Sequence, residues 1–309
     1  MSHSVWFTCP SSASSDSSFD EDEVNFRMRP CWPKYLGILH RRGFRLDTVR
    51  DVKNYYRSNG APKKADRLQG LDDDSLCPDA GLPDNLFRGI KTLNGTPIMV
   101  KAVHRKSREL DIIRFLSSPS MMRQSLNHCI PVHDLIDVAD DSIAFIVMEQ
   151  WSPINDSSCC LRCFLTTLRQ CIEHCSFMHK HHIAHLDISL RNLLTDYKGH
   201  YAFIDFELSR RFEVGNPRIT GRRGTELPPE CIDGAFYDPY KVDVWALGVL
   251  ILRVSKLAGF CIPEILDVVK PMLHENPAQR PSLDMVMQAF NHVTSSTSLQ
   301  RLQSLPSTH

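Results

Sequence analysis

The stretch His185-Leu-Asp-Ile-Ser-Leu-Arg-Asn192, followed by Phe203-Ile-Asp-Phe-Glu207, decides which fold the sequence predicts. Asp187 and Asn192 are five positions apart, and Asp205 follows Asn192 by thirteen positions. Short apolar segments flank both groups, so we expect these three side chains close to the ends of strands. Such a set suits phosphoryl transfer from a metal-bound nucleotide, because one acid orients an attacking hydroxyl while the amide and the other acid bind Mg²⁺.

Length and charge limit the classes of protein to which the chain could belong. Its 309 residues are enough for one large domain or two modest ones. Lys plus Arg and Asp plus Glu both number 36, and this zero formal charge argues against nucleic acid or a membrane surface as partner. We expect no signal peptide or transmembrane segment, because no apolar run is long enough, and therefore an intracellular protein, cytoplasmic or nuclear.

The cysteines number eleven, which is odd, and their spacing is irregular. Five of them gather in one stretch: Cys159, Cys160, Cys163, Cys171 and Cys175. The last three fall on a helical pattern, and no paired C-x₂-C motif has a matching partner. Mostly buried, reduced thiols are therefore favoured over a zinc site.

The first half of the chain changes character twice. Residues 1–24 are rich in Ser and then acidic, which predicts a disordered tail. Residues 25–84 are interpreted as an N-terminal extension followed by an irregular insertion rich in Gly, Pro, Lys and Asp. Residues 85–150 are predicted to form a small lobe of strands with one helix. Two of its strands are apolar runs that meet at Asn94-Gly95, a strong hairpin signal.

The second half is expected to be mainly helical. Residues 151–293 contain a long amphipathic pattern from Leu161 to His181 and a nearly continuous apolar run from Asp243 to Leu252. Two further helices are predicted over 262–273 and 283–292. Residues 294–309 are polar and predict a flexible tail.

Several short motifs, taken in order, resemble the protein kinase superfamily over residues 85–292. They are Ile98-Met-Val-Lys101, Arg108-Glu109, Val147-Met-Glu149, the two opening stretches, Pro228-Pro-Glu230, Asp243-Val-Trp-Ala-Leu-Gly248 and Gln279-Arg-Pro281. The divergent small lobe and the Ser-rich flank look like the protein kinase-like families expanded in fungi. The resemblance implies an α+β, bilobal fold, with a small antiparallel-sheet lobe plus one helix and a larger, mainly helical lobe.

The resemblance also implies roles for the polar residues of the site. Asp187 matches the catalytic base, and Asn192 and Asp205 match the ligands of Mg²⁺. Lys101 matches the strand lysine that holds the α- and β-phosphates of ATP, and Glu109 matches its partner on the following helix.

Further positions match the adenine site and the internal supports of the family. Met148 matches the residue that gates the back of the adenine pocket, and Glu149, Gln150 and Trp151 match the hinge. His185, Phe206 and Ile113 match a stacked apolar column inside the family's fold, and Asp243 matches the residue that anchors this column from below. Glu230 and Arg280 match a buried ion pair.

The sequence departs from the family pattern at four places. No G-x-G-x-x-G motif precedes Lys101, although the glycines within 57–84 could form a rearranged cover. Leu186 replaces the arginine that pairs with a phosphorylated activation segment, so we expect that mode of switching to be absent. Glu207 replaces a glycine, and the connection between Lys101 and Glu109 is very short.

Three functions remain open from the sequence. The first is an ATP-dependent kinase acting on a protein or peptide hydroxyl, with Ser/Thr as default and Tyr suggested by Ser189 and Arg191. The second is a pseudokinase, a nucleotide-binding or scaffolding module. The third is a small-molecule kinase of the choline or aminoglycoside type, favoured by Ile204-Asp-Phe-Glu207 and opposed by the motifs that follow it. The oligomeric state is left open.

Overall fold

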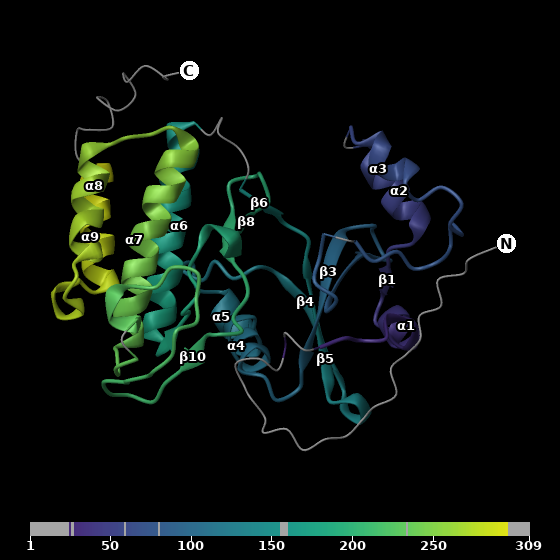
Figure 1. Ribbon diagram of the computed structural model, residues 1–309, viewed down its shortest axis with the longest axis horizontal. Coiled ribbons are helices and arrows are strands. Elements are labelled where there is room, and N and C mark those ends of the chain that lie inside the picture. The colour runs from purple at the N-terminus through teal and green to yellow at the C-terminus, as the bar shows by residue number, and fades with distance from the viewer. Residues whose placement is uncertain are drawn as a thin grey trace. The chain divides into compact units, whose positions relative to one another are not determined.

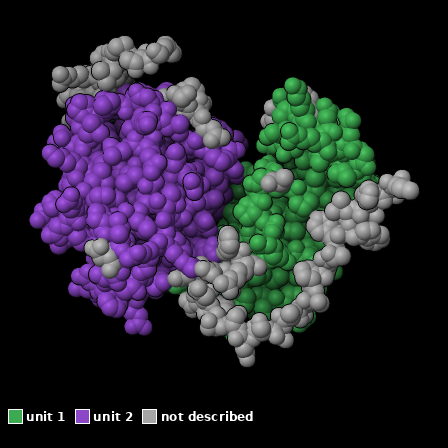
Figure 2. Space-filling model, in the orientation of Figure 1, with its two compact units in different colours: residues 1–110, 131–150 green, residues 111–130, 151–309 purple. Residues whose placement is uncertain are grey.

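The computed structural model forms two compact units (Figures 1 and 2). Unit 1 comprises residues 1–110 and 131–150, and unit 2 comprises residues 111–130 and 151–309. The structure describes residues 25, 28–58, 60–79, 81–154, 160–232 and 234–295. The tail predicted for residues 1–24 and most of the predicted C-terminal tail lie outside these described residues.

Unit 1 is built on a five-stranded antiparallel sheet with the order β1-β2-β3-β5-β4. Its strands are β1 (Phe44–Leu46), β2 (Leu86–Lys91), β3 (Pro97–His104), β4 (Val132–Val138) and β5 (Ile143–Glu149). The hairpin predicted at Asn94-Gly95 joins β2 to β3, and Gly95 supplies the left-handed backbone of the turn (φ 70°). The antiparallel sheet expected from the sequence is confirmed.

Strand β1 lies within the segment that the sequence had assigned to an N-terminal extension. It is three residues long and falls within Gly43-Phe-Arg-Leu46, one of the strand-like runs that the sequence offers between Trp32 and Tyr56. Gly89 of β2 makes room for it, because a Cβ at that position would lie 2.4 Å from the main-chain oxygen of Arg45. The connection from β1 to β2 spans residues 47–85 and contains α2 (Val49–Ser58) and α3 (Pro62–Asp66), where the sequence suggested an irregular insertion.

The apolar core of unit 1 lies between the sheet and α1 (Trp32–Arg41). The ring of Trp32 packs edge-on against Phe87 at 5.2 Å, and Tyr35 packs against Phe145 at 5.0 Å between centroids. On β3, the residues that belong to this core are Ile98, Val100 and Ala102. Side chains alternate along a strand, so Lys101 projects from the opposite face of the sheet.

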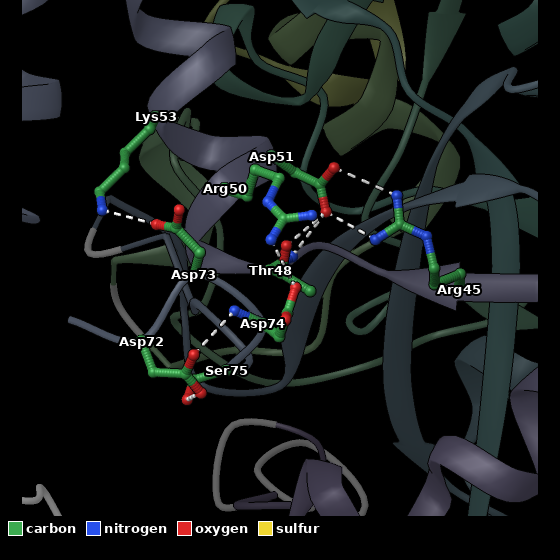
Figure 3. Close-up of polar contacts among 9 residues, drawn as sticks. All are labelled: Arg45, Thr48, Arg50, Asp51, Lys53, Asp72, Asp73, Asp74 and Ser75. Atoms are coloured by element: carbon green, nitrogen blue, oxygen red, sulfur yellow. Dashed lines mark hydrogen bonds and ion pairs between the residues drawn. The ribbon is translucent and has the colours of Figure 1, made fainter.

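Charged side chains fix the start of the β1–β2 connection (Figure 3). The carboxylate of Asp51 accepts two hydrogen bonds from the Arg45 guanidinium, at 2.6 and 3.1 Å. It also accepts the backbone N–H of Thr48 at 2.8 Å and the Thr48 hydroxyl at 2.9 Å. Burial opposes ionisation of Asp51, but these hydrogen bonds outweigh it and lower its pKa to about 2.

The acidic run 72–74 ties the end of this connection back to α2 (Figure 3). Lys53 pairs with Asp73 at 2.7 Å, and Arg50 pairs with Asp74 at 3.0 Å. Exposed pairs of this kind contribute little energy individually. Their value is positional, since they hold the acidic run against α2 within the connection of residues 47–85.

Asp47 gives a pH-dependent prediction for unit 1. Burial, followed by the negative charge of Asp51, raises the pKa of Asp47 to about 6. The folded state therefore prefers the protonated carboxyl, and folding stability should fall as the pH rises from about 4 to about 6. Replacing Asp47 by Asn should raise the free energy of unfolding above pH 6 by at most about 3 kcal/mol and change little below pH 4. Urea unfolding across this pH range measures the effect.

Asp51→Asn provides the control with the opposite sign. The low pKa of Asp51 means that its carboxylate stabilises the fold above about pH 4 and loses this contribution as the pH falls toward 2. The Asp51 variant should therefore be less stable than the parent at pH 7. Equal stability of the parent and the Asp47 variant at every pH would contradict the assignment.

Unit 2 is mainly helical, as the sequence predicts (Figure 1). Its helices include α5 (Pro119–Met122), α6 (Leu161–Lys180), α7 (Pro239–Ala258), α8 (Pro263–Val269) and α9 (Leu283–Ser295). Helix α4 (Arg108–Leu116) begins in unit 1 and belongs to unit 2 from residue 111 onward. Helix α9 includes residues 294 and 295, which the sequence assigned to a flexible tail, because buried Thr294 continues the helix. The short strands are β6 (Ser152–Pro153), β7 (Ile183–Ala184), β8 (Leu193–Thr195), β9 (Tyr201–Phe203) and β10 (Arg210–Arg211).

The core of unit 2 follows the predicted apolar patterns. Helix α7 starts earlier than its apolar run suggested, because Asp238 caps it by accepting the N–H of Tyr240. Close packing of α7 depends on Gly248, where a Cβ would lie 2.9 Å from the Leu273 side chain. The predicted α+β fold class is confirmed.

No helix within the described residues is long and apolar enough to cross a bilayer.

Candidate active site

The carboxylate of Asp187 is held in one orientation by two donors. Its Oδ1 accepts the backbone N–H of Thr225 at 2.6 Å, and its Oδ2 accepts the side-chain amide of Asn192 at 2.8 Å. The Asn192 amide nitrogen also donates to the Asp187 carbonyl at 3.0 Å, because the 3₁₀ turn Leu190–Asn192 folds the chain back. The structure thus brings together two residues that the opening stretch singled out.

Thr225 was not identified from the sequence as part of this site. The contact depends on Gly224, whose backbone is left-handed (φ 122°). A Cβ on Gly224 would lie 2.7 Å from the carbonyl oxygen of Leu186, so only glycine allows this approach. The signal available in the sequence was a Gly-Thr pair after a basic segment, which carries no information about its distance from Asp187.

Asp243, on α7, anchors the loop that carries Asp187. This fully buried carboxylate accepts the backbone N–H of His185 at 2.7 Å and that of Leu186 at 2.8 Å. The imidazole of His179 lies 2.9 Å from the same carboxylate. Three polar partners compensate the cost of burying this side chain, which fits the structural role expected for Asp243.

His185 packs inside unit 2 and does not face a reaction site. Its ring lies 5.0 Å from that of Phe206 and 5.6 Å from that of Phe203. Complete burial lowers the pKa of His185, and this effect outweighs the nearby carboxylates, led by Asp243, which raise it. The Nε2 atom of His185 has no hydrogen-bond partner in the described structure. A neutral, packed imidazole suits a structural role better than proton transfer.

Asp205 follows β9 directly and lies beside the Asn192 loop. The backbone N–H of Ile204 donates to the Asn192 carbonyl at 3.0 Å, which joins the two segments. Asp205 adopts the left-handed conformation (φ 64°), which aspartate tolerates better than most residues. Glu207, where the family has glycine, is not among the residues with positive φ.

The donor chemistry of Asp205 and Asn192 fits a magnesium ion. Mg²⁺ prefers hard oxygen ligands, and these residues offer a carboxylate and an amide oxygen. Both hydrogen bonds described for Asn192 use its amide nitrogen, so its Oδ1 is the atom suited to a cation. We retain both residues as candidate magnesium ligands.

Lys101 and Glu109 form a buried ion pair within unit 1. The Lys101 Nζ lies 2.6 Å from Glu109 Oε1, and the two side chains are only 11% and 2% exposed. Three residues connect β3 to α4. This short connection still allows Lys101 and Glu109 to pair, because α4 begins at Arg108 and places Glu109 in its first turn. An ammonium held in this way has a fixed position on the sheet face opposite the α1 core.

Asn25 is a third member of this group, and the sequence offered no signal for it. Its side-chain amide donates to Glu109 Oε2 at 2.9 Å, and its carbonyl oxygen accepts the backbone N–H of His104 at 2.9 Å. Asn25 is only 1% exposed. The amide therefore ties the carboxylate that pairs with Lys101 to the end of β3.

The predicted hinge positions lie at the end of β5 and directly after it. Met148 is 9% exposed near the end of β5. The backbone N–H of Glu149 donates to the Pro131 carbonyl at 3.0 Å, and that of Gln150 donates to the Pro97 carbonyl at 3.2 Å. Both N–H groups are engaged within unit 1, and the assignment of Glu149, Gln150 and Trp151 to the hinge stays a prediction. Trp151 belongs to unit 2, where its ring lies 6.5 Å from that of His200.

Comparison with known proteins decides the family. The family model described as the protein kinase domain matches residues 87–261, which is more than half of the chain. The chain belongs to the protein kinase family. The match begins at the second strand, β2, and therefore omits β1 and the 47–85 connection, where this kinase-family chain departs from the usual pattern.

Individual kinases are similar at low identity. A probable serine/threonine-protein kinase of Saccharomyces cerevisiae is 26% identical over 54% of this chain and 26% of its own length. The carbon catabolite-derepressing protein kinase of Candida glabrata is 27% identical over 60% of this chain and 33% of its own length. An Aurora kinase of Schizosaccharomyces pombe is 32% identical over 37% of this chain and 38% of its own. The chain spans less than two thirds of each of these relatives.

The ion pair expected in the kinase large lobe is present. Arg280 donates to Glu230 through both terminal nitrogens, at 2.5 and 2.7 Å. Its guanidinium also donates to the carbonyls of His274 and Lys241 and lies 4.8 Å from the ring centroid of Trp245. The Arg280 side chain is completely buried.

Leu186 replaces a charged residue of the kinase pattern and is packed rather than paired. It is 9% exposed and belongs to an apolar cluster with Ile219, Cys231 and Tyr237. A leucine in this environment offers no charge to a phosphorylated segment. The absence of that mode of switching stays a prediction, now with a physical reason.

Proposed function

We propose that this chain is an ATP-dependent protein kinase that transfers the γ-phosphoryl group of MgATP to a protein hydroxyl. The observation that carries the proposal is the Asp187 carboxylate, fixed by Asn192 and the Thr225 N–H beside the Asp205 segment. Serine or threonine is the default acceptor, in keeping with the name of the similar Saccharomyces cerevisiae kinase, and tyrosine is the alternative.

Asp187 would orient the acceptor hydroxyl and receive its proton. A carboxylate with both oxygens already accepting hydrogen bonds cannot rotate, so its remaining lone pairs keep a fixed direction. Phosphoryl transfer demands little covalent chemistry from the protein, and positioning supplies most of the rate. The anchoring of this loop by Asp243 serves the same end.

Lys101 would contact the α- and β-phosphates of ATP. The Glu109 carboxylate keeps the ammonium charged and points it in one direction, which is what a phosphate clamp requires. Asn192 and Asp205 would hold Mg²⁺, which when bound neutralises charge on the phosphates.

A pseudokinase is the second candidate, and one observation favours it. The chain between β1 and β2 is not a short glycine-rich loop but residues 47–85, which include α2 and α3. A glycine-rich loop binds phosphates through closely approaching backbone N–H groups. A helical connection does not offer its backbone N–H groups in this way. The measurement that separates the two candidates therefore begins with their affinity for ATP. The small-molecule kinase is less favoured, because the Glu230–Arg280 pair is formed.

The deciding experiment combines nucleotide binding with turnover. Thermal unfolding of the full chain should be measured with ATP, with and without Mg²⁺, alongside transfer of labelled γ-phosphate to a general protein substrate and to the chain itself. Stabilisation by about 2.7 kcal/mol is expected at a ligand concentration of 100 times Kd. Stabilisation with turnover supports the kinase. Stabilisation without turnover supports a nucleotide-binding pseudokinase. The absence of both contradicts the kinase and leaves only the scaffolding form of the pseudokinase.

Asn25 gives a further prediction about the proposed kinase. Asn25→Asp is nearly isosteric but places a second carboxylate against Glu109, which should disturb the ion pair with Lys101. Losing a hydrogen bond to a charged group costs about 1.5–3 kcal/mol, so kcat/KM for ATP should fall roughly tenfold or more. Steady-state kinetics with varied ATP measures this, and most of the change should appear in KM.

Asn85→Ala is the matched control. Asn85 is also buried and donates to β3, at the Ala102 carbonyl (3.3 Å), and its described hydrogen bonds do not involve Glu109. It should lower stability while leaving KM for ATP unchanged. If the Asn25 and Asn85 variants lose stability equally and both keep the parental KM, Asn25 has no positioning role.

A further inference from the structure

Two cysteine thiols meet at the start of α6. Cys160 is the N-cap residue of this helix, and Cys163 lies in its first turn, in a C-x-x-C arrangement. Their sulfur atoms are 3.1 Å apart, and both residues are exposed. The expectation of mostly buried thiols holds for Cys171 and Cys175 further along the helix but is wrong for this pair.

We propose that Cys160 and Cys163 form a redox-active dithiol, which a low-molecular-weight disulfide such as glutathione disulfide oxidises to a disulfide within the first turn of α6. The site is separate from the residues assigned to phosphoryl transfer. Its chemistry therefore does not depend on the proposed kinase activity.

Cys160 is suited to be the attacking thiol. Its sulfur accepts the backbone N–H of Cys163 at 3.3 Å, at the positive end of a 20-residue helix. That N–H, the Cys163 thiol and the neighbouring Arg162 outweigh a slight opposing effect of burial and lower the pKa of Cys160. A thiolate at an exposed helix N-terminus is the reactive form in thiol–disulfide exchange.

The geometry of the pair needs little adjustment for bond formation. A disulfide requires about 2.05 Å between sulfur atoms and roughly 4.4–6.8 Å between α-carbons. The backbone N–H of Cys163 already donates to the Cys160 sulfur, so the two residues lie close together at the start of the helix. The sulfur atoms must approach by only about 1 Å from their present separation.

The proposed step balances in two exchanges. The Cys160 thiolate attacks one sulfur of the small disulfide, forms a mixed disulfide and expels the first small thiolate. The Cys163 thiol then loses its proton and attacks the Cys160 sulfur, which expels the second small thiolate. One disulfide is reduced to two small thiols, two protein thiols are oxidised to one disulfide, and no other reagent is consumed.

A metal site is a weaker interpretation of the same pair. Zinc sites use four ligands in structural centres, or three plus water in catalytic ones. Among the residues that the structure describes, no group of three or more His, Cys, Asp or Glu side chains is placed to hold a metal ion.

The experiment uses the full chain carrying Cys159→Ala, because Cys159 adjoins Cys160 in the sequence. The protein is equilibrated in buffers of reduced and oxidised glutathione, blocked with an alkylating agent, digested with trypsin and analysed by mass spectrometry. Trypsin cuts after Arg162, between the two cysteines, so the two peptides separate unless a disulfide links them. The expected result is a linked pair, two hydrogens lighter than the two peptides together, that reduction splits.

Single variants test the order of events. Cys163→Ser should stop at a stable adduct between glutathione and Cys160, whereas Cys160→Ser should form little adduct at Cys163. Cys261, an exposed cysteine elsewhere in unit 2, is the matched control and should react more slowly than Cys160 near neutral pH. Separate peptides under oxidising buffers, or equal alkylation rates for Cys160 and Cys261, would overturn the proposal.

Discussion

Replacing Asp187 by Asn is expected to abolish most phosphoryl transfer, with kcat reduced about 10²–10⁴-fold. The substitution removes the group that receives the proton of the acceptor hydroxyl. It also creates a local conflict, because both carboxylate oxygens accept from donors, the Thr225 N–H and the Asn192 amide. An Asn side chain has only one oxygen, so one donor must then face the new NH₂ group. Transfer of labelled phosphate at saturating ATP measures the loss.

The Asp187 variant must be shown to be folded and able to bind nucleotide. Its thermal unfolding should change by no more than a few degrees, and stabilisation by MgATP should remain, since Asp187 is not assigned to the nucleotide. Asp196→Asn is a suitable control, because Asp196 caps a turn of the same unit through its bonds to Lys198 and His200. Parental turnover in the Asp187 variant would falsify the role of this residue.

Replacing Glu230 by Ala is expected to destabilise unit 2 by about 3–5 kcal/mol. The Arg280 side chain is completely buried, and Glu230 is the carboxylate that neutralises it. Truncation would leave a guanidinium buried with carbonyl partners alone, and the desolvation cost of its charge would no longer be compensated. The midpoint of urea unfolding, followed by tryptophan fluorescence, measures the change.

Glu226→Ala is the matched control for that prediction. Glu226 pairs with Arg253 at 2.8 Å, but the Arg253 side chain is 54% exposed, so this pair should contribute about 0–1 kcal/mol. Glu230→Gln should fall between the two, since it keeps an acceptor and loses the charge. Equal losses in the Glu226 and Glu230 variants would show that burial of Arg280 does not determine the cost.

The helices and central strands were predictable because their patterns are local. Apolar residues recur every three to four positions in α6 and α9, and the turn at Asn94-Gly95 carries its own signal. The same holds for Asp187 and Asn192, which lie five positions apart in one loop and are in contact. The family assignment followed from the order of such motifs along the chain.

Other features depend on contacts that local patterns do not encode. The pairing of β1 with β2 is not encoded in the strand-like run Gly43-Phe-Arg-Leu46 itself, and this pairing makes residues 47–85 the connection between the first two strands. The sequence did not reveal that Cys160 and Cys163 form an exposed pair. The periodicity of the later cysteines indicates the buried face of the helix, but it does not show that the helix begins between Cys160 and Cys163.

The order of short motifs along the chain predicts the family, the fold class and the residues proposed for catalysis. The contacts that hold those residues in position come from the packing of distant segments. Asn25 meets Glu109 across 84 positions, Asp243 meets the His185 backbone across 58, and Thr225 meets Asp187 across 38. The physical reason is that these supports are single hydrogen bonds between distant segments, and their geometry is set by the packing of whole elements rather than by any periodicity near the residues themselves.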